Sequence, residues 1–389
     1  MVRIIPDSYT EYLSGKVIVP PSLPNIEGKM GSAGGGEIGR VYLVGDIQTA
    51  KTIFISGELL KALEESFNAG ASLIYAQRIG PATHSEILLN DSGGAVALKL
   101  KSFEPGAYYN GIEVDVVEDG SSVTLTVLNT HTDEETNFIG NNVSDLADEI
   151  NTNQSLITAE AMGSVLPAAI SPTNLTGGTD GENLTNGDYI DGLSVFESHP
   201  EISWLHCIGA DSLPLWIAIT THCDYMVREN LSERFSLLEP PRFTPVIPNK
   251  PTVSEIQSYV DTITLMTQSF SNRNAVVIAG EGNFIGSDGN EYRNTLTATL
   301  SGIMASIPFQ KSLIGEKLST VIGLYPEFTP AQITQFIQSK INFGRLEPGV
   351  GFIVGHSLTL TPMGDTYNRI EKLRSIYYAG KQVRLTAFP

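Results

Sequence analysis

The sequence predicts an α/β (α+β) core with an inserted small mostly-β domain and extended terminal arms. Runs rich in β-branched and aromatic residues alternate with segments whose apolar residues recur every three or four positions, which is the pattern of an α/β domain. Between residues 85 and 182 the apolar period changes to two, and this stretch holds sixteen acidic residues against two basic ones. A simultaneous change of period and charge indicates a separate domain.

The chain divides into five predicted segments. Residues 1–30 form an N-terminal arm, because Pro20, Pro21 and Pro24 stiffen the backbone and remove hydrogen-bond donors. The other segments are a first part of the core (31–84), the inserted acidic outer domain (85–182), a second part of the core (183–348), and a C-terminal strand, basic helix and final strand (349–389).

The core is predicted from alternating buried strands and amphipathic helices. Its first part contains the strand Arg40–Gly45, the helix Gly57–Asn68 and the strand Ala71–Arg78. Its second part contains the strands Ile202–Ile208, Arg234–Pro241 and Ala275–Ala279, and the helices Leu213–Asn230, Val253–Phe270, Tyr292–Ile307 and Pro330–Asn342.

The inserted domain is predicted from short alternating runs that are separated by turn residues. Its strands are Ala95–Lys101, Ile112–Val117, Val123–Leu128, Glu135–Ile139 and Ser155–Ala161, with one helix at Val143–Asn151. The stretch Ser171–Gly181 has no apolar periodicity and is predicted to be a loop. Helical spacing resumes at Tyr189, which marks the return to the core.

The C-terminal segment begins with a predicted buried strand, Val350–Leu360, and continues into a helix, Asp365–Ala379. Asp365 is a suitable N-cap, and Gly380 follows the predicted end. The buried stripe of this helix is Ile370, Leu373 and Tyr377, which lie three and four positions apart.

A final strand is predicted at Gln382–Phe388, where apolar and polar residues alternate. A strand at this position needs an edge to pair with, in the same subunit or in a neighbour, and strand addition is a common mode of association. The candidate inter-subunit residues are Val383, Arg384, Leu385, Thr386, Ala387 and Phe388.

Residues 366–389 carry five basic residues and one acidic residue, a net charge of +4, in a chain whose total is −19. A basic helix on an acidic protein suggests an acidic partner surface. The alternative is that Lys and Arg simply favour the last turns of a helix.

Composition excludes several classes of protein. A net charge of −19 argues against nucleic acid as the main partner. No apolar run is long enough to span a membrane, and the first residues have no signal-peptide core. Two cysteines are too few for a disulfide framework. We therefore expect a cytosolic protein without stable membrane insertion. Only 17% of the residues are charged, which suggests that much of the surface is covered in an assembly.

One glycine motif formally matches a dinucleotide-binding fingerprint. The residues Gly34, Gly36 and Gly39 have the required spacing, but the fingerprint needs a strand before it and a helix after it. Here a strand follows, which favours a flexible joint over a nucleotide site.

Two His-Cys pairs, His206-Cys207 and His222-Cys223, raise the possibility of zinc. Adjacent residues of a strand point to opposite faces, which favours buried thiols and ordinary histidines over a metal site. Asp288–Glu291 lacks the spaced ligands of a calcium loop, and no nucleophile elbow, phosphate-binding lysine loop or zinc-protease motif occurs. The sequence therefore predicts no metal, no cofactor and no catalytic site.

Taken in order, these features resemble those of the contractile tail sheath proteins of phages, pyocins and related injection systems. The likeness lies in the ordered set rather than in any single motif. Its pieces are VYLVG and SLIYAQRIG around the first core unit, the inserted domain with its exit LTGGTDG (Leu175–Gly181), RFSLLEPP (Arg234–Pro241), NTLTATLSGIMASIP (Asn294–Pro308), and the final strand, basic helix and strand.

The resemblance implies a structural protein and not an enzyme. Such subunits form stacked hexameric rings around an inner tail tube, are joined by their terminal arms, and contract when triggered. The partners that the resemblance implies are other copies of the subunit, the inner tube protein, and the baseplate and tail terminator proteins. The location that it implies is a virion tail, which is assembled in the host cytoplasm. The basic helix would then face the tube through Arg369, Lys372 and Arg374, with Arg374 nearer the buried stripe.

Three alternatives remain at this point. The sheath could belong to a non-viral contractile injection system instead of a phage. An α/β enzyme would need a polar cluster in a cleft, which the sequence does not reveal. A static capsid or surface-layer protein fits the composition but not the basic C-terminal helix.

Overall fold

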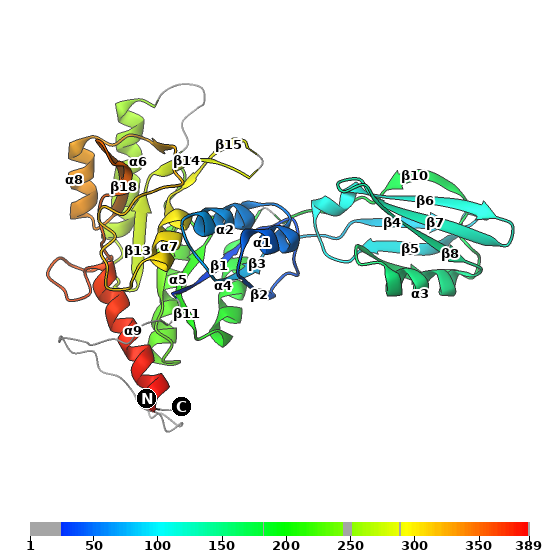
Figure 1. Cartoon of the computed structure of the whole chain (residues 1–389), viewed down its shortest axis with the longest axis horizontal. Coiled ribbons are helices and arrows are strands. Elements are labelled where there is room, and N and C mark those ends of the chain that lie inside the picture. The colour runs from blue at the N-terminus through cyan, green and yellow to red at the C-terminus, as the bar shows by residue number, and fades with distance from the viewer. Residues whose placement is uncertain (1–24, 182, 244–250, 288, 388–389) are drawn as a thin grey trace.

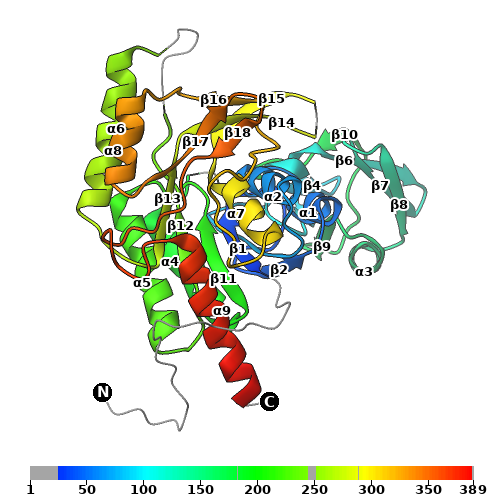
Figure 2. The same cartoon turned by 60° about the vertical axis from the view of Figure 1, so that its left-hand side comes forward.

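The computed structural model describes residues 25–181, 183–243, 251–287 and 289–387. Most of the predicted N-terminal arm, residues 1–24, lies outside this range. Figures 1 and 2 show an α/β body from which a β-rich unit projects to one side, with the C-terminal helix extending from the bottom of the body.

The body is built on an eight-stranded sheet of order β18-β17-β13-β12-β11-β1-β3-β2. The strands from β17 to β3 run parallel, and β18 and β2 are antiparallel edges. Their bounds are β1 Ile26–Gly31, β2 Val41–Val44, β3 Ile74–Arg78, β11 Ile202–Cys207, β12 Phe235–Leu238, β13 Ala275–Ala279, β17 Asn342–Glu347 and β18 Gly351–Val354.

Helices cover both faces of this sheet, which explains why central strands such as β13 are buried on both sides. One face packs on α4, α5, α6 and α8, and the other packs on α1, α2, α7 and α9. Their bounds are α1 Ile47–Phe54, α2 Glu58–Asn68, α4 Asn186–Val195, α5 Leu213–Arg228, α6 Val253–Gln268, α7 Thr297–Ser306, α8 Pro330–Gln338 and α9 Ile370–Ala387, with a 3-10 turn at Phe196–Ser198.

Helix α7 packs closely against α2 because its residues are small. A Cβ atom on Gly302 would lie 2.3 Å from the carbonyl oxygen of Ser66, so only glycine fits there. The helix is shorter than predicted, since residues 291–295 form β15, which pairs with β14 (Glu281–Ile285). With β16 (Gly323–Tyr325) these strands make a small sheet above the core.

The projecting β-rich unit has its own hydrophobic core, which includes Leu125, Val127 and Phe138. A four-stranded sheet of order β10-β6-β7-β8 faces a three-stranded sheet of order β4-β5-β9. The bounds are β4 Glu86–Asn90, β5 Val96–Ser102, β6 Ile112–Asp119, β7 Ser122–Asn129, β8 Glu134–Gly140, β9 Ile157–Ala161, β10 Ile170–Asn174, helix α3 Val143–Asn153 and a 3-10 turn at Ala107–Gly111.

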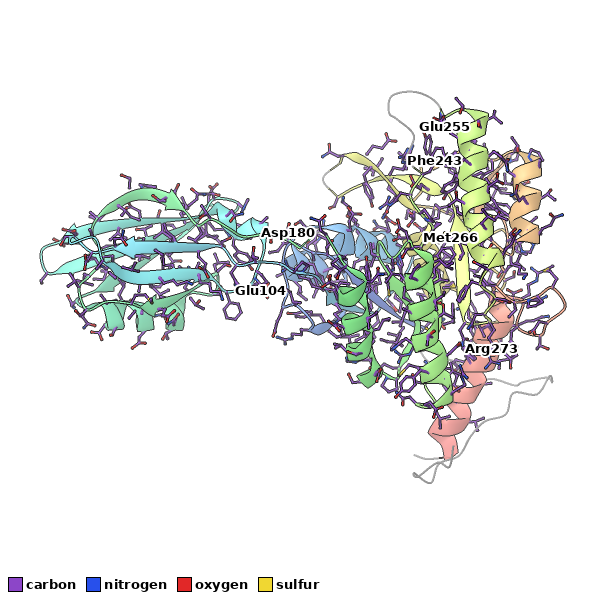
Figure 3. The ribbon with its side chains drawn as sticks, turned by 180° about the vertical axis from the view of Figure 1, so that it is seen from behind. Glu104, Asp180, Phe243, Glu255, Met266 and Arg273 are labelled. Carbon is purple, nitrogen blue, oxygen red and sulfur yellow. The ribbon has the colours of Figure 1, made fainter. Side chains whose placement is uncertain are left out.

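The junction between body and projecting unit centres on Arg78, which is fully buried at the end of β3. Its guanidinium Nη1 donates to the carbonyl oxygens of Gly36 (3.0 Å) and Pro105 (2.5 Å), one on each side of the junction. Glu104 and Asp180, both labelled in Figure 3, add contacts at the same place: Glu104 accepts from the Gly36 amide at 2.6 Å, and Asp180 accepts from the Ala107 amide at 2.7 Å.

Several sequence predictions need correction. Residues 26–30 are not part of an arm, because β1 lies in the centre of the sheet between β3 and β11. The arm was predicted from Pro20, Pro21 and Pro24, all of which precede β1. Within β1, Glu27 and Lys29 pair with each other in the interior at 3.2 Å. The predicted loop 171–181 begins in β10, and the predicted strand 350–360 is regular only over β18. The elements α1, β4, β14, β16 and β17 were not predicted.

We expect the projecting unit to unfold independently of the body. Replacing Leu125, fully buried in β7, with Ala should destabilise that unit by about 2–5 kcal/mol. The matched change Val117→Ala, at a side chain that is 53% exposed, should cost little. Calorimetry should show one transition shifted by Leu125→Ala and the other unchanged. A common shift of both transitions would mean that the chain unfolds as one unit.

Candidate interaction surface

The C-terminal helix α9 lies across the starts of strands β1, β11 and β12 and then extends past the body (Figure 2). Its predicted buried stripe is confirmed, since Ile370, Leu373 and Tyr377 are 4% exposed or less. The helix starts at Ile370 rather than at Asp365. The Asp365 carboxylate instead accepts from the Tyr367 amide at 2.7 Å in the preceding turn.

The predicted strand Gln382–Phe388 is wrong for the isolated chain, because α9 continues to Ala387; Phe388 lies outside the described residues. Gly380 does not end the helix but is buried within it. Adding a residue to an existing helix gains one hydrogen bond, whereas a strand needs an edge alongside. The alternation of Val383, Leu385 and Ala387 is too short to overcome that difference.

The three candidate tube-facing cations occupy different environments. Lys372 is exposed on α9, and Arg369 is half-buried just before the helix begins. Neither forms an ion pair with any other residue in the described part of the chain. These two side chains are placed where a partner could reach them.

Arg374, by contrast, is buried and does not face solvent, which corrects its assignment to the exposed basic face. Its Nη2 atom donates to the carbonyl oxygens of Met304 (2.7 Å) and Ile307 (3.1 Å) at the end of α7. Burial lowers the pKa of this guanidinium to about 9. The sequence signal for the burial of Arg374 was its position next to Leu373, a residue of the buried stripe.

A groove of about 440 Å³ runs between α9 and the amino-terminal ends of β1, β11 and β12. Its walls are mainly apolar and include the aromatic residues Trp204, Phe235, Tyr377 and Tyr378. Asn25, where the described chain begins, also lines it. Sequence reasoning missed this groove, because it is formed by residues that are far apart in the chain.

Lys381 closes the far end of the groove. Its Nζ atom donates to the carbonyl oxygens of Glu201 (3.3 Å) and Ile202 (3.0 Å). Burial and the nearby Arg234 guanidinium lower the pKa of this amine to about 7. The Glu201 carboxylate does not bind Lys381 but accepts a hydrogen bond from the Tyr75 hydroxyl.

A second cluster of ionisable groups lies inside the body, closed to solvent. The Lys29 amine is 3.2 Å from Glu27 Oε2 and 3.2 Å from His206 Nδ1, and His206 Nε2 is 3.6 Å from Glu239 Oε1. Nearby, burial raises the pKa of Glu65 to about 8. These side chains are 3% exposed or less, so the cluster offers a substrate no access.

The two His-Cys pairs do not converge. His206 belongs to the buried cluster, while the imidazole of His222 lies 3.5 Å from the Arg234 guanidinium. Cys207 and Cys223 are buried free thiols. Among the described residues no group of three or more His, Cys, Asp or Glu side chains is arranged to hold a metal ion. No helix in this part of the chain is long and apolar enough to cross a membrane.

Comparison with known proteins places the fold. No family model and no curated protein matches the sequence. Among solved structures, the sheath tail protein of Desulfitobacterium hafniense superposes with a TM-score of 0.71 at 16% identity, over 97% of this chain and 83% of the other. This chain has the fold of the tail sheath proteins.

Other structures with the sheath fold agree. The sheath tail protein of Listeria innocua gives a TM-score of 0.69 at 14% identity, over 95% of this chain and 77% of that one. The baseplate of the anti-feeding prophage in its contracted state contains a chain with a TM-score of 0.53 at 12% identity, over 98% of this chain and 77% of that chain. The predicted α/β fold class is therefore confirmed.

The difference between Arg374 and Lys372 can be measured. Arg374→Ala should destabilise the body by about 2–4 kcal/mol, because it leaves the carbonyls of Met304 and Ile307 without a donor in the interior. Lys372→Ala, two residues away and exposed, should change the free energy of unfolding by less than about 0.5 kcal/mol. Urea unfolding of both variants tests this, and equal losses would contradict the buried placement.

Proposed function

We propose that this protein is the structural subunit of a contractile tail sheath. It polymerises as stacked hexameric rings around an inner tail tube, and contraction of the polymer drives the tube through a target envelope. The observation that carries this proposal is the superposition of 97% of the chain on a tail sheath protein, projecting unit included.

The proposal includes a mechanism that requires no catalysis and no cofactor. The sheath is assembled in an extended state, and a rearrangement of contacts between rings releases the stored free energy. Each subunit moves as a rigid body, which fits the densely packed core of the eight-stranded sheet. The closed position of the ionisable cluster around Lys29 supports a structural role for these charged residues.

The partners in this proposal are other copies of the chain, the inner tube protein, and the baseplate and tail terminator proteins. The location is a virion tail that is assembled in the host cytoplasm. A non-viral contractile injection system is the second candidate, because a chain of the anti-feeding prophage baseplate shares the fold.

The projecting unit would lie on the outside of the particle. Residues 85–182 carry an excess of fourteen negative charges, which are well solvated but repel one another in a packed interface. The body, with five excess negative charges, would then supply the contacts around the tube.

Arg369 and Lys372 are the proposed tube contacts. Each exposed ionic contact is worth only about 0–1 kcal/mol, but a ring repeats it in every subunit. Because Arg374 is buried, it would support α9 from within instead of touching the tube.

Reversing both charges tests the tube contact. The variant Arg369→Glu/Lys372→Glu should fold and still form contracted cylinders by itself, but should no longer form extended sheath around the tube protein. Negative-stain microscopy of sheath co-assembled with its tube would show this.

The matched control is Lys51→Glu/Lys317→Glu, which makes the same charge change on α1 and on the loop after α7. It should give normal extended tails. Normal tails from the Arg369/Lys372 variant as well would remove the tube-facing assignment.

We also propose that the end of the chain links subunits. Removing residues 384–389 shortens α9 beyond the body and should abolish cylinders while leaving the circular dichroism of the monomer nearly unchanged. Light scattering and microscopy measure the loss. Intact cylinders from the truncated protein would show that other surfaces hold the rings together. This proposal does not depend on whether the segment is helical or extended in the polymer.

A further inference from the structure

The groove beside α9 contains a buried cation whose hydrogen-bonding capacity is only partly used. Arg374 is 4% exposed, and its Nη2 atom serves the two carbonyls at the end of α7. Its Nε and Nη1 atoms have no acceptor among the described residues. A buried guanidinium with unused donors costs free energy, and a carboxylate is the acceptor that restores most of it.

The rest of the groove defines what accompanies that carboxylate. The Arg374 guanidinium carbon lies 5.8 Å from the centre of the Trp204 ring, and the remaining wall is mainly aromatic and aliphatic. The other cation, Lys381, already donates to two carbonyl oxygens, and the Glu201 carboxylate is engaged by Tyr75. A second carboxylate, Glu233, lies just before β12 and also lines the groove. The part of the groove at Arg374 and Trp204 therefore fits a carboxylate that is flanked by aromatic or aliphatic side chains.

The chain itself contains such a stretch close to the groove. Before Asn25 the only acidic residues are Asp7 and Glu11, and they lie in the sequence Asp-Ser-Tyr-Thr-Glu-Tyr-Leu of residues 7–13. Here a carboxylate has tyrosines on both sides. No other part of residues 1–24 combines negative charge with aromatic side chains.

The distance along the chain permits this contact within one subunit. Asn25 lines the groove, and only eleven residues separate it from Leu13. A fully extended segment of this length spans up to about 40 Å, so it can fold back over a groove of this size. The effective concentration of a tethered segment does not fall on dilution, so the same chain is favoured over a second subunit in dilute solution.

We propose that, in the unassembled subunit, the groove binds the stretch Asp7–Leu13 of the same chain, with a carboxylate of the stretch on Arg374 and its tyrosines against the aromatic wall. Bound in this way, the stretch covers the groove and is held against its own subunit. Assembly would then have to displace it, which makes the groove a device against premature polymerisation. The binding itself does not depend on the proposed sheath function, although this consequence does.

Photo-crosslinking of the full-length protein tests the proposal. With Tyr12 replaced by p-benzoylphenylalanine, irradiation of dilute subunit should give crosslinks to groove residues such as Trp204, Leu231 and Tyr378. The same probe at Val2, outside the stretch, should crosslink there at least tenfold less. Mass spectrometry of digested protein identifies the joined peptides.

Two further experiments test whether the carboxylates are needed for the contact and whether the bound stretch comes from the same subunit. Adding Asp7→Asn/Glu11→Gln should lower the yield of the Tyr12 crosslink about tenfold, whereas Lys16→Gln should leave it unchanged; neither alters the folded body. In an equal mixture of unlabelled and nitrogen-15 protein, the joined peptides should come from one isotope only. Crosslinks elsewhere, a yield that is insensitive to the two carboxylates, or mixed-isotope peptides would each overturn the proposal, whether or not the protein forms cylinders.

Discussion

The buried ion pair between Glu27 and Lys29 is the interaction on which the arrangement of the body depends. Both side chains project from the central strand β1 toward the face covered by α2 and α7, and both are fully buried. Separating two such charges in the interior would be far more costly than breaking an exposed pair. Lys29 also reaches His206 on β11, while Glu27 accepts from Ser301 on α7. The pair therefore fixes the positions of α7, β1 and β11 relative to one another.

The close packing of α7 follows from this fixed position. Trp204 donates to the Ser301 hydroxyl at 2.7 Å, and Ser66 of α2 donates to the carbonyl oxygen of Ala298 at 2.7 Å, so polar contacts hold both helices at a short distance from each other. At that distance large side chains do not fit, which is why α7 consists of Thr, Ala, Ser, Gly and a few aliphatic residues. The end of α7 in turn holds Arg374, and through it α9 is attached to the sheet.

Most helices and buried strands of the body could be predicted from apolar periodicity, and so could the β-rich unit, because these signals are local. Strand β1 could not, since only the folded interior brings a partner to each of its charges. Whether the chain after Gly380 is helical or extended depends on whether an edge strand lies nearby. The local sequence pattern contains no information about such a neighbour. For the candidate surface, the sequence identified the basic character of the helix and its buried stripe. It could not separate exposed Lys372 from buried Arg374, nor reveal a groove that is assembled from three strands and a helix.

The central position of β1 has a mechanical consequence. Residues 1–24 join the body at the start of a strand that is hydrogen-bonded in parallel to β11 on one side and to β3 on the other. A pull along this strand loads both ladders at once, whereas a pull along an edge strand such as β2 or β18 would load only one. The N-terminal segment is thus attached to a strand that is held on both sides. A load transmitted through this segment would move the whole α/β body before it could extract the strand.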